Sequence, residues 1–363
     1  MNLYQFFRPL IFCFEPELAH DLAVKLIRNY PFYFGKISEY DNLAIKLWGL
    51  DFKNPIGMAA GFDKNAKIPV KLAKFGFGFI ECGTVTPLAQ SGNLGPRIFR
   101  LAKDQSIINR LGFNNDGADC FLNNIKTQLD NLSRLKIPIG INIGKNKDSE
   151  NTASDYISLL NKFYDYASYI TINISSPNTK NLRDIQKSSQ LDSFLKAIKN
   201  HQNILQSKSK KRPPLLLKIA PDLTIQEQEE IAAICLENKI DGLIISNTTI
   251  SRPDNLSDNL SGGRKGEQGG LSGKALLDKS NQVLKNIYLL TEAKIPIIGV
   301  GGVSNAEDVY QKISLGASMV QIYTAFIYQG FGLVEKIKSD LSKKIAAEGF
   351  KNLSEAVGCK VKY

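Results

Sequence analysis

The stretch TINISSPNT, residues 171–179, holds two adjacent serines, Ser175 and Ser176, where an apolar run ends at a proline. A serine that attacks a substrate or takes a proton usually relies on a nearby histidine to accept its own proton. The sequence has two histidines, His20 and His201, and neither is close to this stretch. The chemistry of these serines therefore depends on groups from other parts of the chain.

Polar side chains end the apolar runs along much of the chain. They include Asp63, Lys64, Thr84, Asn142, Asn173, Asn178, Lys218, Asn247 and Thr248. Each alone is unremarkable, because Asn and Thr commonly end strands. Their repetition at the ends of successive runs predicts one site that is built from many strands.

Two glycine-rich stretches and one lysine indicate the ligand of that site. The stretches are GEQGGLSG (266–273) and GVGG (299–302). Glycine permits positive φ and a close approach of backbone N–H groups to a phosphate, although one such stretch alone would more simply be a turn. Lys218 ends the apolar run PLLLK, where a lysine is costly to bury without an anionic partner. Together these features favour a phosphorylated cofactor whose ring becomes an anion on reduction.

Short apolar runs alternate with longer stretches of helical period after about residue 40. The runs are NPIGMAAG (54–61), FGFIECG (77–83), IGINIG (139–144), YITINIS (169–175), PLLLKIA (214–220), GLIISN (242–247), PIIGVGG (296–302) and MVQIY (319–323). They are typical of parallel strands covered on both faces. The helical stretches lie near residues 64–75, 114–129, 152–167, 189–206, 224–238, 274–292, 305–315 and 331–346. This alternation predicts a (β/α)8 barrel. A doubly wound sheet is disfavoured because no G-x-G-x-x-G follows the first run.

Composition disfavours several classes of protein. The 363 residues carry a formal charge of +11, but apart from residues 208–212 the lysines are dispersed, so nucleic-acid binding is disfavoured and an anionic membrane surface is the alternative. The five cysteines are scattered without a C-x-x-C pair, which predicts a reducing compartment and no metal site. The Phe- and Leu-rich first 30 residues fit neither a membrane span nor a signal peptide.

Long motifs follow one another through nearly the whole chain. They are EPELAHDL (15–22), NPIGMAAGFDKN (54–65), GFIECGTVTP (78–87), PRIFRLAKDQSIINRLGFNN (96–115), GINIGKNK (140–147), YITINISSPNTKNLR (169–183), KIAPDL (218–223), IISNTT (244–249), GGLSG (269–273), PIIGVGGV (296–303) and MVQIYTAF (319–326). In this order they closely resemble the dihydroorotate dehydrogenases, and among them the class 2, membrane-associated, quinone-reducing branch. The resemblance implies an FMN-containing (β/α)8 barrel at residues 41–363, preceded by a helical extension at residues 1–40.

The resemblance implies one FMN per chain, lying across the barrel mouth. The matching positions are Ala60, Gly61, Phe62, Asp63, Lys64, Thr84, Asn142, Asn173, Lys218, Ser246, Gly273, Gly302, Tyr323 and Thr324. The last four of these would hold the ribityl phosphate. Lys218 would lie beside the isoalloxazine and offset the charge of the reduced ring.

The implied reaction is the oxidation of dihydroorotate to orotate in de novo pyrimidine biosynthesis, with hydride passing from C6 to flavin N5. Ser176 matches the serine base that takes the proton from C5, whereas Ser175 is expected to be a turn residue. Serine is a poor base, so its own proton must leave by a relay, in which a threonine and water are expected. The matching substrate positions are Lys64, Asn109, Arg110, Leu111, Gly112, Phe113, Asn173, Asn178, Asn247 and Thr248. Asparagines suit a ring of alternating N–H and C=O groups, because their side chains both donate and accept.

The N-terminal extension separates the quinone-reducing branch from the branches that use fumarate or NAD, which lack it and carry cysteine as the base. Pro16 marks a helix start, and residues 3–14 are expected to form a second helix. The resemblance implies a monomer bound peripherally to the cytoplasmic face of the cell (inner) membrane, with a membrane quinone as electron acceptor. His20, Arg100 and Tyr323 match a quinone path toward the flavin.

Two other functions stay open at this point. A soluble dihydroorotate dehydrogenase with another electron acceptor is disfavoured by Ser176, by the extension and by the lack of cysteine clusters for an iron–sulfur partner. A non-catalytic flavin-binding or membrane-surface protein on the same barrel is disfavoured by the intact row of strand-end residues. A purified protein without yellow colour would favour that second alternative.

Overall fold

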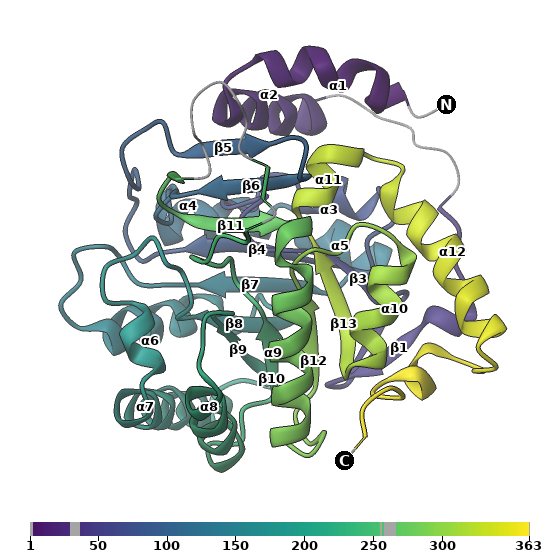
Figure 1. The fold of residues 1–363 in the computed structure, drawn as a ribbon. Helices are drawn as coiled ribbons and strands as arrows, with labels where there is room; N and C mark the ends of the chain where they lie inside the picture. Colours follow the sequence, from purple (N-terminus) through teal and green to yellow (C-terminus); the bar gives the residue numbers. More distant parts are fainter. Residues whose placement is uncertain (1–2, 30–36, 255, 258–265, 363) are drawn as a thin grey trace.

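The computed structural model describes residues 3–29, 37–254, 256–257 and 266–362. These residues form a closed barrel of eight parallel strands in the order β10-β12-β13-β3-β4-β7-β8-β9 (Figure 1). The strands are β3 (Ile56–Met58), β4 (Phe79–Val85), β7 (Ile139–Ile143), β8 (Tyr169–Asn173), β9 (Leu215–Ile219), β10 (Gly242–Ile245), β12 (Ile297–Val300) and β13 (Ala317–Ile322). Each predicted apolar run coincides with one of them, so the predicted (β/α)8 barrel is confirmed.

The strands are apolar along their length because the barrel buries both of their faces. All residues of β4, β7, β8, β9 and β10 are buried. Inside the barrel, large rings pack against glycines: a Cβ at Gly57 would lie 2.3 Å from the Phe79 ring, and one at Gly140 would lie 2.2 Å from the Tyr169 ring. The end opposite the mouth is closed by the hairpin β1 (Ile45–Leu47) and β2 (Leu50–Phe52). Between these strands Trp48 packs on Tyr169.

Helices surround the barrel as the alternating sequence predicts. They are α3 (Pro69–Ala73), α4 (Gly117–Lys126), α5 (Leu129–Leu135), α6 (Thr152–Phe163), α7 (Ser188–Gln206), α8 (Ile225–Glu237), α9 (Leu277–Leu290), α10 (Ala306–Ser314), α11 (Thr324–Gln329) and α12 (Leu333–Ala347), with short 3-10 helices η1 (Asp41–Leu43), η2 (Arg183–Gln186), η4 (Lys274–Leu276) and η5 (Leu353–Ala356). The helix predicted near residues 64–75 is wrong in length. Its first half is a loop in which the Asp63 carboxylate accepts hydrogen bonds from the backbone N–H groups of Lys67 and Ile68.

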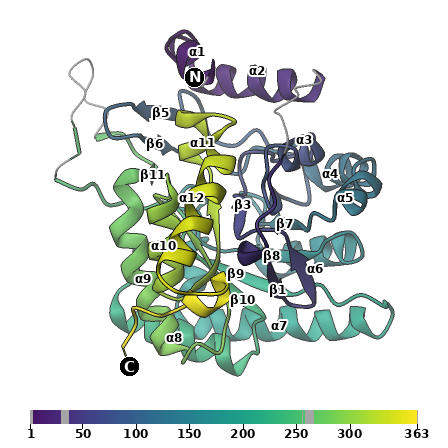
Figure 2. The same cartoon turned by 90° about the vertical axis from the view of Figure 1, so that its right-hand side faces the viewer.

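The barrel mouth carries a second, antiparallel sheet that the sequence did not predict. It consists of β5 (Ile98–Leu101), β6 (Ser106–Asn109) and β11 (Gly270–Gly273), in the order β11-β6-β5. Its small core contains Phe99, Leu101, Ile108 and Leu271. Figures 1 and 2 show this sheet between the barrel and the N-terminal helices. The sheet therefore forms a wall above the ends of the barrel strands.

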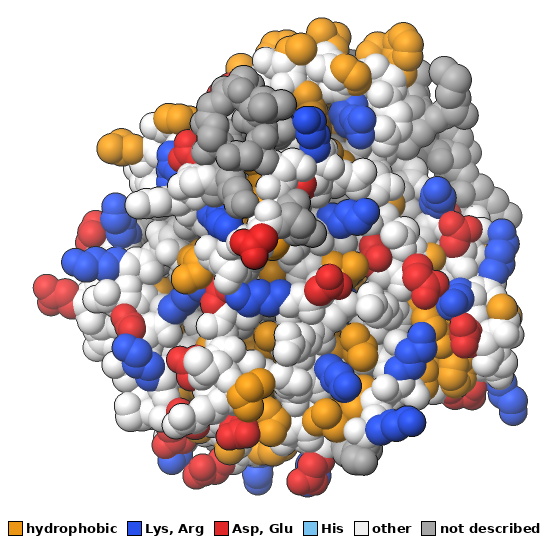
Figure 3. Space-filling model, viewed as in Figure 1, with side chains coloured by type: hydrophobic (Ala, Val, Ile, Leu, Met, Phe, Trp, Pro, Cys, Tyr) orange, Lys and Arg blue, Asp and Glu red, His pale blue; other side chains and the backbone are white. Residues whose placement is uncertain are grey.

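The N-terminal helices α1 (Leu3–Cys13) and α2 (Pro16–Asn29) confirm the predicted helical pair, with Pro16 at the helix start. They lie across the mouth side of the molecule, and α2 contacts β5 (Figures 1 and 2). Their outer surface exposes large apolar side chains, with Phe6 69% and Leu10 62% exposed. Hydrophobic side chains gather along this edge in Figure 3. None of the helices in the described part of the chain is long and apolar enough to cross a membrane.

Candidate active site

A cavity of about 1860 Å³ lies between the barrel mouth, the β5–β6–β11 sheet and helices α1 and α2. The predicted site residues that line it are His20, Ala60, Gly61, Phe62, Asp63, Lys64, Thr84, Arg100, Asn109, Leu111, Gly112, Phe113, Asn173, Ser176, Asn178, Lys218, Ser246, Asn247, Thr248, Gly273, Gly302, Tyr323 and Thr324. This volume exceeds the roughly 300–1,000 Å³ of a site for one drug-sized ligand. The ends of the barrel strands thus meet in one cavity that has room for more than one ligand.

Two predicted residues lie apart from the cavity lining. Asn142 is fully buried behind Thr84 and Asn173, whose side chains contact it directly. Arg110 turns away from the cavity, forms an ion pair with Glu267 at 2.6 Å and lies over the Phe99 ring. Asn142 is therefore placed to orient its neighbours, while the side chain of Arg110 holds the sheet to the β11 segment.

A buried carboxylate, Glu81 of β4, organises the floor of the cavity. It is 0% exposed, and it accepts hydrogen bonds from Asn142 Nδ2 at 2.8 Å and from Gln321 Nε2 at 2.7 Å. Asn142 Oδ1 in turn accepts hydrogen bonds from Thr84 Oγ1 and Asn173 Nδ2. Because both carboxylate oxygens of Glu81 accept hydrogen bonds from amide N–H groups, they fix which end of each amide faces the next. Glu81 was missed in the sequence, although a glutamate inside the apolar run FGFIECG could have revealed it.

Lys218, at the end of β9, carries a buried amine that faces the cavity. Its side chain is 5% exposed, and no described residue accepts a hydrogen bond or forms an ion pair with its Nζ. Burial lowers the pKa of Lys218, and the Glu81 carboxylate across the barrel partly offsets this. A cation in this position is costly unless a ligand supplies negative charge. The site is thus matched to a ligand that carries or acquires negative charge beside Lys218.

Glycines shape another part of the cavity wall. Gly301 and Gly302, after β12, have φ angles of 110° and 81°, and a Cβ at Gly302 would lie 2.5 Å from Leu277 Cα. Within the described ranges, no group accepts a hydrogen bond from the N–H of Gly301, Gly302 or Thr324. Nearby, the hydroxyl groups of Ser272 and Thr324 lie 2.9 Å apart. Free backbone donors and hydroxyl groups on one wall are the chemistry of a phosphate site.

Ser176 and Ser175 have different surroundings. Ser176 is 5% exposed, lines the cavity, and its Oγ accepts a hydrogen bond from the N–H of Asn178 at 3.2 Å. Ser175 was expected to be a turn residue. It is instead fully buried, where its Oγ donates to Asn173 Oδ1 and accepts from Asn247 Nδ2. Ser176 is thus the serine that can reach a ligand, and Ser175 links two asparagines.

The two histidines lie on other elements, and neither bonds to Ser176 among the described residues. His201, on α7, contacts Asn161.

A second, smaller cavity of about 510 Å³ lies behind Ser176, which lines both cavities. Thr179 also lines this smaller cavity, and its buried Oγ1 has no hydrogen-bond partner in the described part of the chain. Ser176 therefore lies between the main cavity and a polar opening toward solvent.

The α2 side of the cavity joins charged and aromatic groups. Lys64 Nζ donates to Asn114 Oδ1 at 2.8 Å, and burial lowers the pKa of Lys64 to about 8. Burial and the nearby Lys64 ammonium lower the pKa of His20 to about 4, so its imidazole is neutral at pH 7. The His20 ring packs edge-on against Phe62, which in turn packs against Tyr323. Neutral and aromatic surfaces thus connect α2 with the barrel mouth.

Arg100 contacts the segment that joins helices α1 and α2. Its guanidinium donates to the backbone carbonyls of Phe12 and Phe14 and lies 4.5 Å from the centre of the Phe12 ring. The hydroxyl group of Tyr323 donates to the carbonyl of Gly61 at 3.1 Å. Of the three residues predicted for the quinone path, His20 and Tyr323 thus share contacts through Phe62, whereas Arg100 lies at the junction of α1 and α2.

Comparisons with known proteins identify the family of this chain. Residues 42–345 match the family model described as "Dihydroorotate dehydrogenase". A protein of Idiomarina loihiensis named "Dihydroorotate dehydrogenase (quinone)" is 46% identical, over 93% of this chain and 100% of its own length. A mitochondrial protein of Oryza sativa with the same name is 43% identical, over 99% of this chain and 80% of its own length. The crystal structure of DHODH from Eimeria tenella in complex with ferulenol superimposes with a TM-score of 0.91 at 37% identity, covering 98% of this chain and 99% of that one. This chain belongs to the dihydroorotate dehydrogenase family.

Proposed function

We propose that this chain is a quinone-dependent dihydroorotate dehydrogenase, which oxidises dihydroorotate to orotate in pyrimidine biosynthesis with FMN as its cofactor. One observation carries the proposal: Ser176 and the buried Lys218, whose amine has no partner among the described residues, face one cavity that extends from the barrel strands to α1 and α2. A flavin beside Lys218, a substrate beside Ser176 and an acceptor arriving under the N-terminal helices each have a place in that cavity. The proposed functional parts are the extension at residues 1–40 and the catalytic barrel at residues 41–363.

The residues present fit FMN. Lys218 would offset the negative charge of the reduced ring, and the N–H groups of Gly301, Gly302 and Thr324 would meet the phosphate. Thr84 and Asn173, fixed through Asn142 and Glu81, would present defined donors and acceptors to the ring edge. When bound, FMN supplies a hydride acceptor and a route by which electrons reach a quinone.

The substrate would occupy the polar side of the same cavity. Asn173, Asn178, Asn247 and Thr248 offer side chains that donate and accept, which suits the ring amides of dihydroorotate. The Lys64 ammonium would meet the substrate carboxylate. Ser176 would take the C5 proton as its own hydroxyl proton passes to water in the smaller cavity. Thr179 Oγ1 is the buried hydroxyl that can bond such a water, which makes it our candidate for the threonine of the relay.

Orotate binding is expected to weaken as the pH rises through 8. The pKa of Lys64 is lowered to about 8, so the ammonium is present below that pH and is lost above it. A bound carboxylate favours the ammonium and raises the pKa of Lys64 in the complex, so the affinity falls from about pH 8 upward until that raised pKa is reached. Lys64→Gln is expected to weaken binding near neutral pH by about 1.5–3 kcal/mol, the value of a charge-assisted hydrogen bond. Titration of the flavin absorbance with orotate measures both effects, and the same pH dependence in Lys64→Gln would assign it to another group.

The exposed apolar surface of α1 and α2 supports a peripheral position on the cytoplasmic face of the cell membrane, where a monomer could take up quinone directly. Leu10→Glu is expected to weaken binding to anionic lipid vesicles by about 1.5–3 kcal/mol. Leu10 is exposed in the free protein, and the substitution removes one leucine from the apolar surface that the membrane would cover. Ile204→Glu is the matched control, since Ile204 is an exposed apolar residue of α7. Vesicle co-sedimentation measures the difference, and equal losses in both variants would argue against this docking face.

The proposal is tested by adding dihydroorotate to the purified protein without oxygen. We expect the yellow flavin to bleach within the mixing time of a rapid-scan experiment, with one orotate formed per flavin. A colourless protein, or a yellow protein that dihydroorotate does not bleach, would favour a non-catalytic role on the same barrel. Charge alone gives no support to nucleic-acid binding, because the lysines are dispersed.

A further inference from the structure

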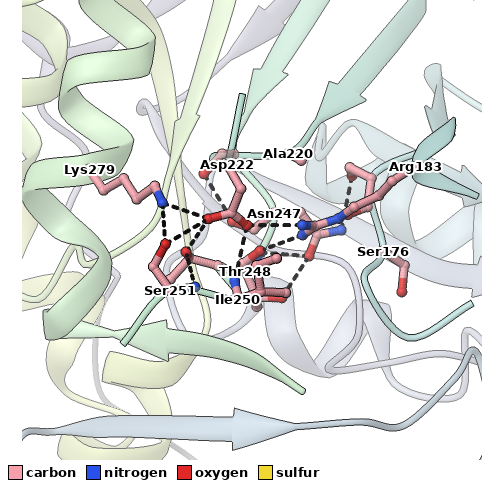
Figure 4. A network of polar contacts seen from close by, with 12 residues as sticks. Ser176, Arg183, Ala220, Asp222, Asn247, Thr248, Ile250, Ser251 and Lys279 are labelled. Carbon is pink, nitrogen blue, oxygen red and sulfur yellow. Dashed lines mark hydrogen bonds and ion pairs between the residues drawn. The ribbon is translucent and has the colours of Figure 1, made fainter. Parts of the chain in front are cut away.

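Arg183 links the ends of three neighbouring barrel strands. It begins η2, a short helix that follows the Ser176 segment in the chain. Its Nε donates to the carbonyl of Ser175 at 3.0 Å, its Nη1 to Asp222 Oδ2 at 2.9 Å, and its Nη2 to the carbonyl of Thr248 at 2.9 Å. Figure 4 shows Arg183 at the centre of these contacts, with Ser176 on the neighbouring turn. One guanidinium thus connects the loops that follow β8, β9 and β10.

Asp222 anchors this guanidinium from the β9 loop. Its carboxylate also accepts from Lys279 Nζ at 2.6 Å, from the N–H of Ile250 at 3.0 Å and from the hydroxyl of Thr249. Burial alone would raise the pKa of Asp222, but these hydrogen bonds together with Arg183 lower it to about 2. The carboxylate is therefore ionised near neutral pH, and it holds both Arg183 and the start of the β10 loop (Figure 4).

Gln186, from the same short helix, also connects the β8 and β9 loops, through the carbonyl that precedes that of Ser175. Its Nε2 donates to the carbonyl of Ile174 at 3.2 Å, and its Oε1 accepts from the N–H of Ala220 at 2.9 Å. The carbonyls of Ile174 and Ser175 are thus both held by η2. The backbone that leads directly into Ser176 is fixed relative to the β9 and β10 loops, while Ser176 itself stays free to face the cavity.

We propose that Arg183 is a positioning residue for Ser176, held in place by Asp222. Through the carbonyls of Ser175 and Thr248, the guanidinium keeps the proton-accepting hydroxyl in register with the substrate-binding β10 loop. Three acceptors in three loops match the planar guanidinium, whose N–H groups point outward in a fixed fork, and a lysine ammonium cannot reach all three. This inference rests on the proposed role of Ser176 as base.

Arg183→Lys keeps the positive charge but loses the set of three hydrogen bonds that joins the loops. At saturating dihydroorotate we expect single-turnover flavin reduction to slow about 10²-fold, the usual effect of misplacing a reacting group by about 1 Å. The oxidised flavin spectrum and the rate of reoxidation by a soluble ubiquinone analogue should not change. Lys279→Met is the matched control, because it removes the other cation on Asp222 and leaves the three bonds of Arg183 in place. The control should be reduced at close to the wild-type rate.

The double variant Ser176→Ala/Arg183→Lys separates positioning from a merely structural role. If Arg183 acts through Ser176, the double variant is reduced no more slowly than Ser176→Ala alone, because the group it positions is already gone. A double variant that is slower by the product of the two single effects would overturn the inference and leave the proposed function intact. Reduction of Ser176→Ala at the wild-type rate would instead overturn the proposed base. Should Arg183→Lys fail to fold with FMN, Asp222→Asn serves in the same cycle, because it removes the anchor of Arg183.

Discussion

Ser176→Ala is expected to slow the reduction of the bound flavin by dihydroorotate by about 10²–10⁴-fold, the usual contribution of a general base. The residue lines the main cavity, is almost fully buried, and opens on its other side to the smaller cavity that contains Thr179. Loss of its hydroxyl removes the proposed acceptor for the C5 proton without removing a contact that Lys218 or the glycines after β12 make. Anaerobic stopped-flow measurement of flavin bleaching gives the rate directly.

The control for Ser176→Ala is the rate at which a quinone analogue reoxidises the reduced flavin. Electrons leave the reduced flavin without a proton being taken from substrate carbon, so Ser176→Ala should be reoxidised by a quinone analogue at the wild-type rate. Its FMN content and its affinity for orotate should also stay close to those of the wild type. Bleaching at the wild-type rate would exclude Ser176 as the base, and a parallel loss in both halves would indicate a damaged site.

Lys218→Met is expected to stabilise the protein without its cofactor and to weaken the binding of the reduced cofactor. Without FMN the variant should be more stable, because a buried amine without a partner among the described residues is replaced by an apolar chain of similar length. With reduced FMN it should bind the cofactor more weakly by about 3–5 kcal/mol, the cost of removing one partner of a buried charge pair. The midpoint potential of the flavin should fall accordingly.

Two measurements check this prediction. Chemical denaturation of the apoprotein gives the change in the free energy of unfolding, and a redox titration of the holoprotein gives the midpoint potential. Lys312→Met is an instructive comparison, since Lys312 is a buried lysine too, but it donates to Ser280 Oγ and Asn281 Oδ1 rather than facing the cavity. An unchanged potential in Lys218→Met would show that the amine does not act on the flavin.

The barrel could be predicted from sequence because its signal is local. Each strand is a short, continuously apolar run, since helices cover one face and the barrel interior the other. The β5–β6–β11 sheet gave no such signal. Its central strand pairs residues 106–109 with the distant residues 270–273, and only folding brings these two segments together, whereas residues 98–101 pair locally with 106–109. The short helix α11 was not predicted either; it begins at Thr324, the second residue of the strand-end pair Tyr323-Thr324.

For the candidate site, the sequence predicted which residues share one cavity, but not the direction in which each side chain points. Residues at strand ends share one cavity because the carboxyl ends of parallel strands meet at the barrel mouth. The direction in which a side chain points was not predictable, and Arg110 illustrates this: it belongs to a matching motif but pairs with Glu267. Thr179 and Arg183 were missed as site residues because the cavity that Thr179 lines and the contacts of Arg183 are formed by distant segments. Glu81 was missed although it stands inside an apolar run.

The central claim, that electrons pass from dihydroorotate through the bound flavin to a quinone, is tested most directly by the choice of electron acceptor. The wild-type protein is first reduced with dihydroorotate under anaerobic conditions, and the return of the yellow colour is then followed after mixing with a ubiquinone analogue, fumarate or NAD⁺ at equal concentrations. We predict that the quinone analogue reoxidises the flavin fastest and that the other two leave it largely reduced. Faster reoxidation by fumarate or NAD⁺ would contradict the account, and would place this chain among the enzymes of the family that use soluble acceptors.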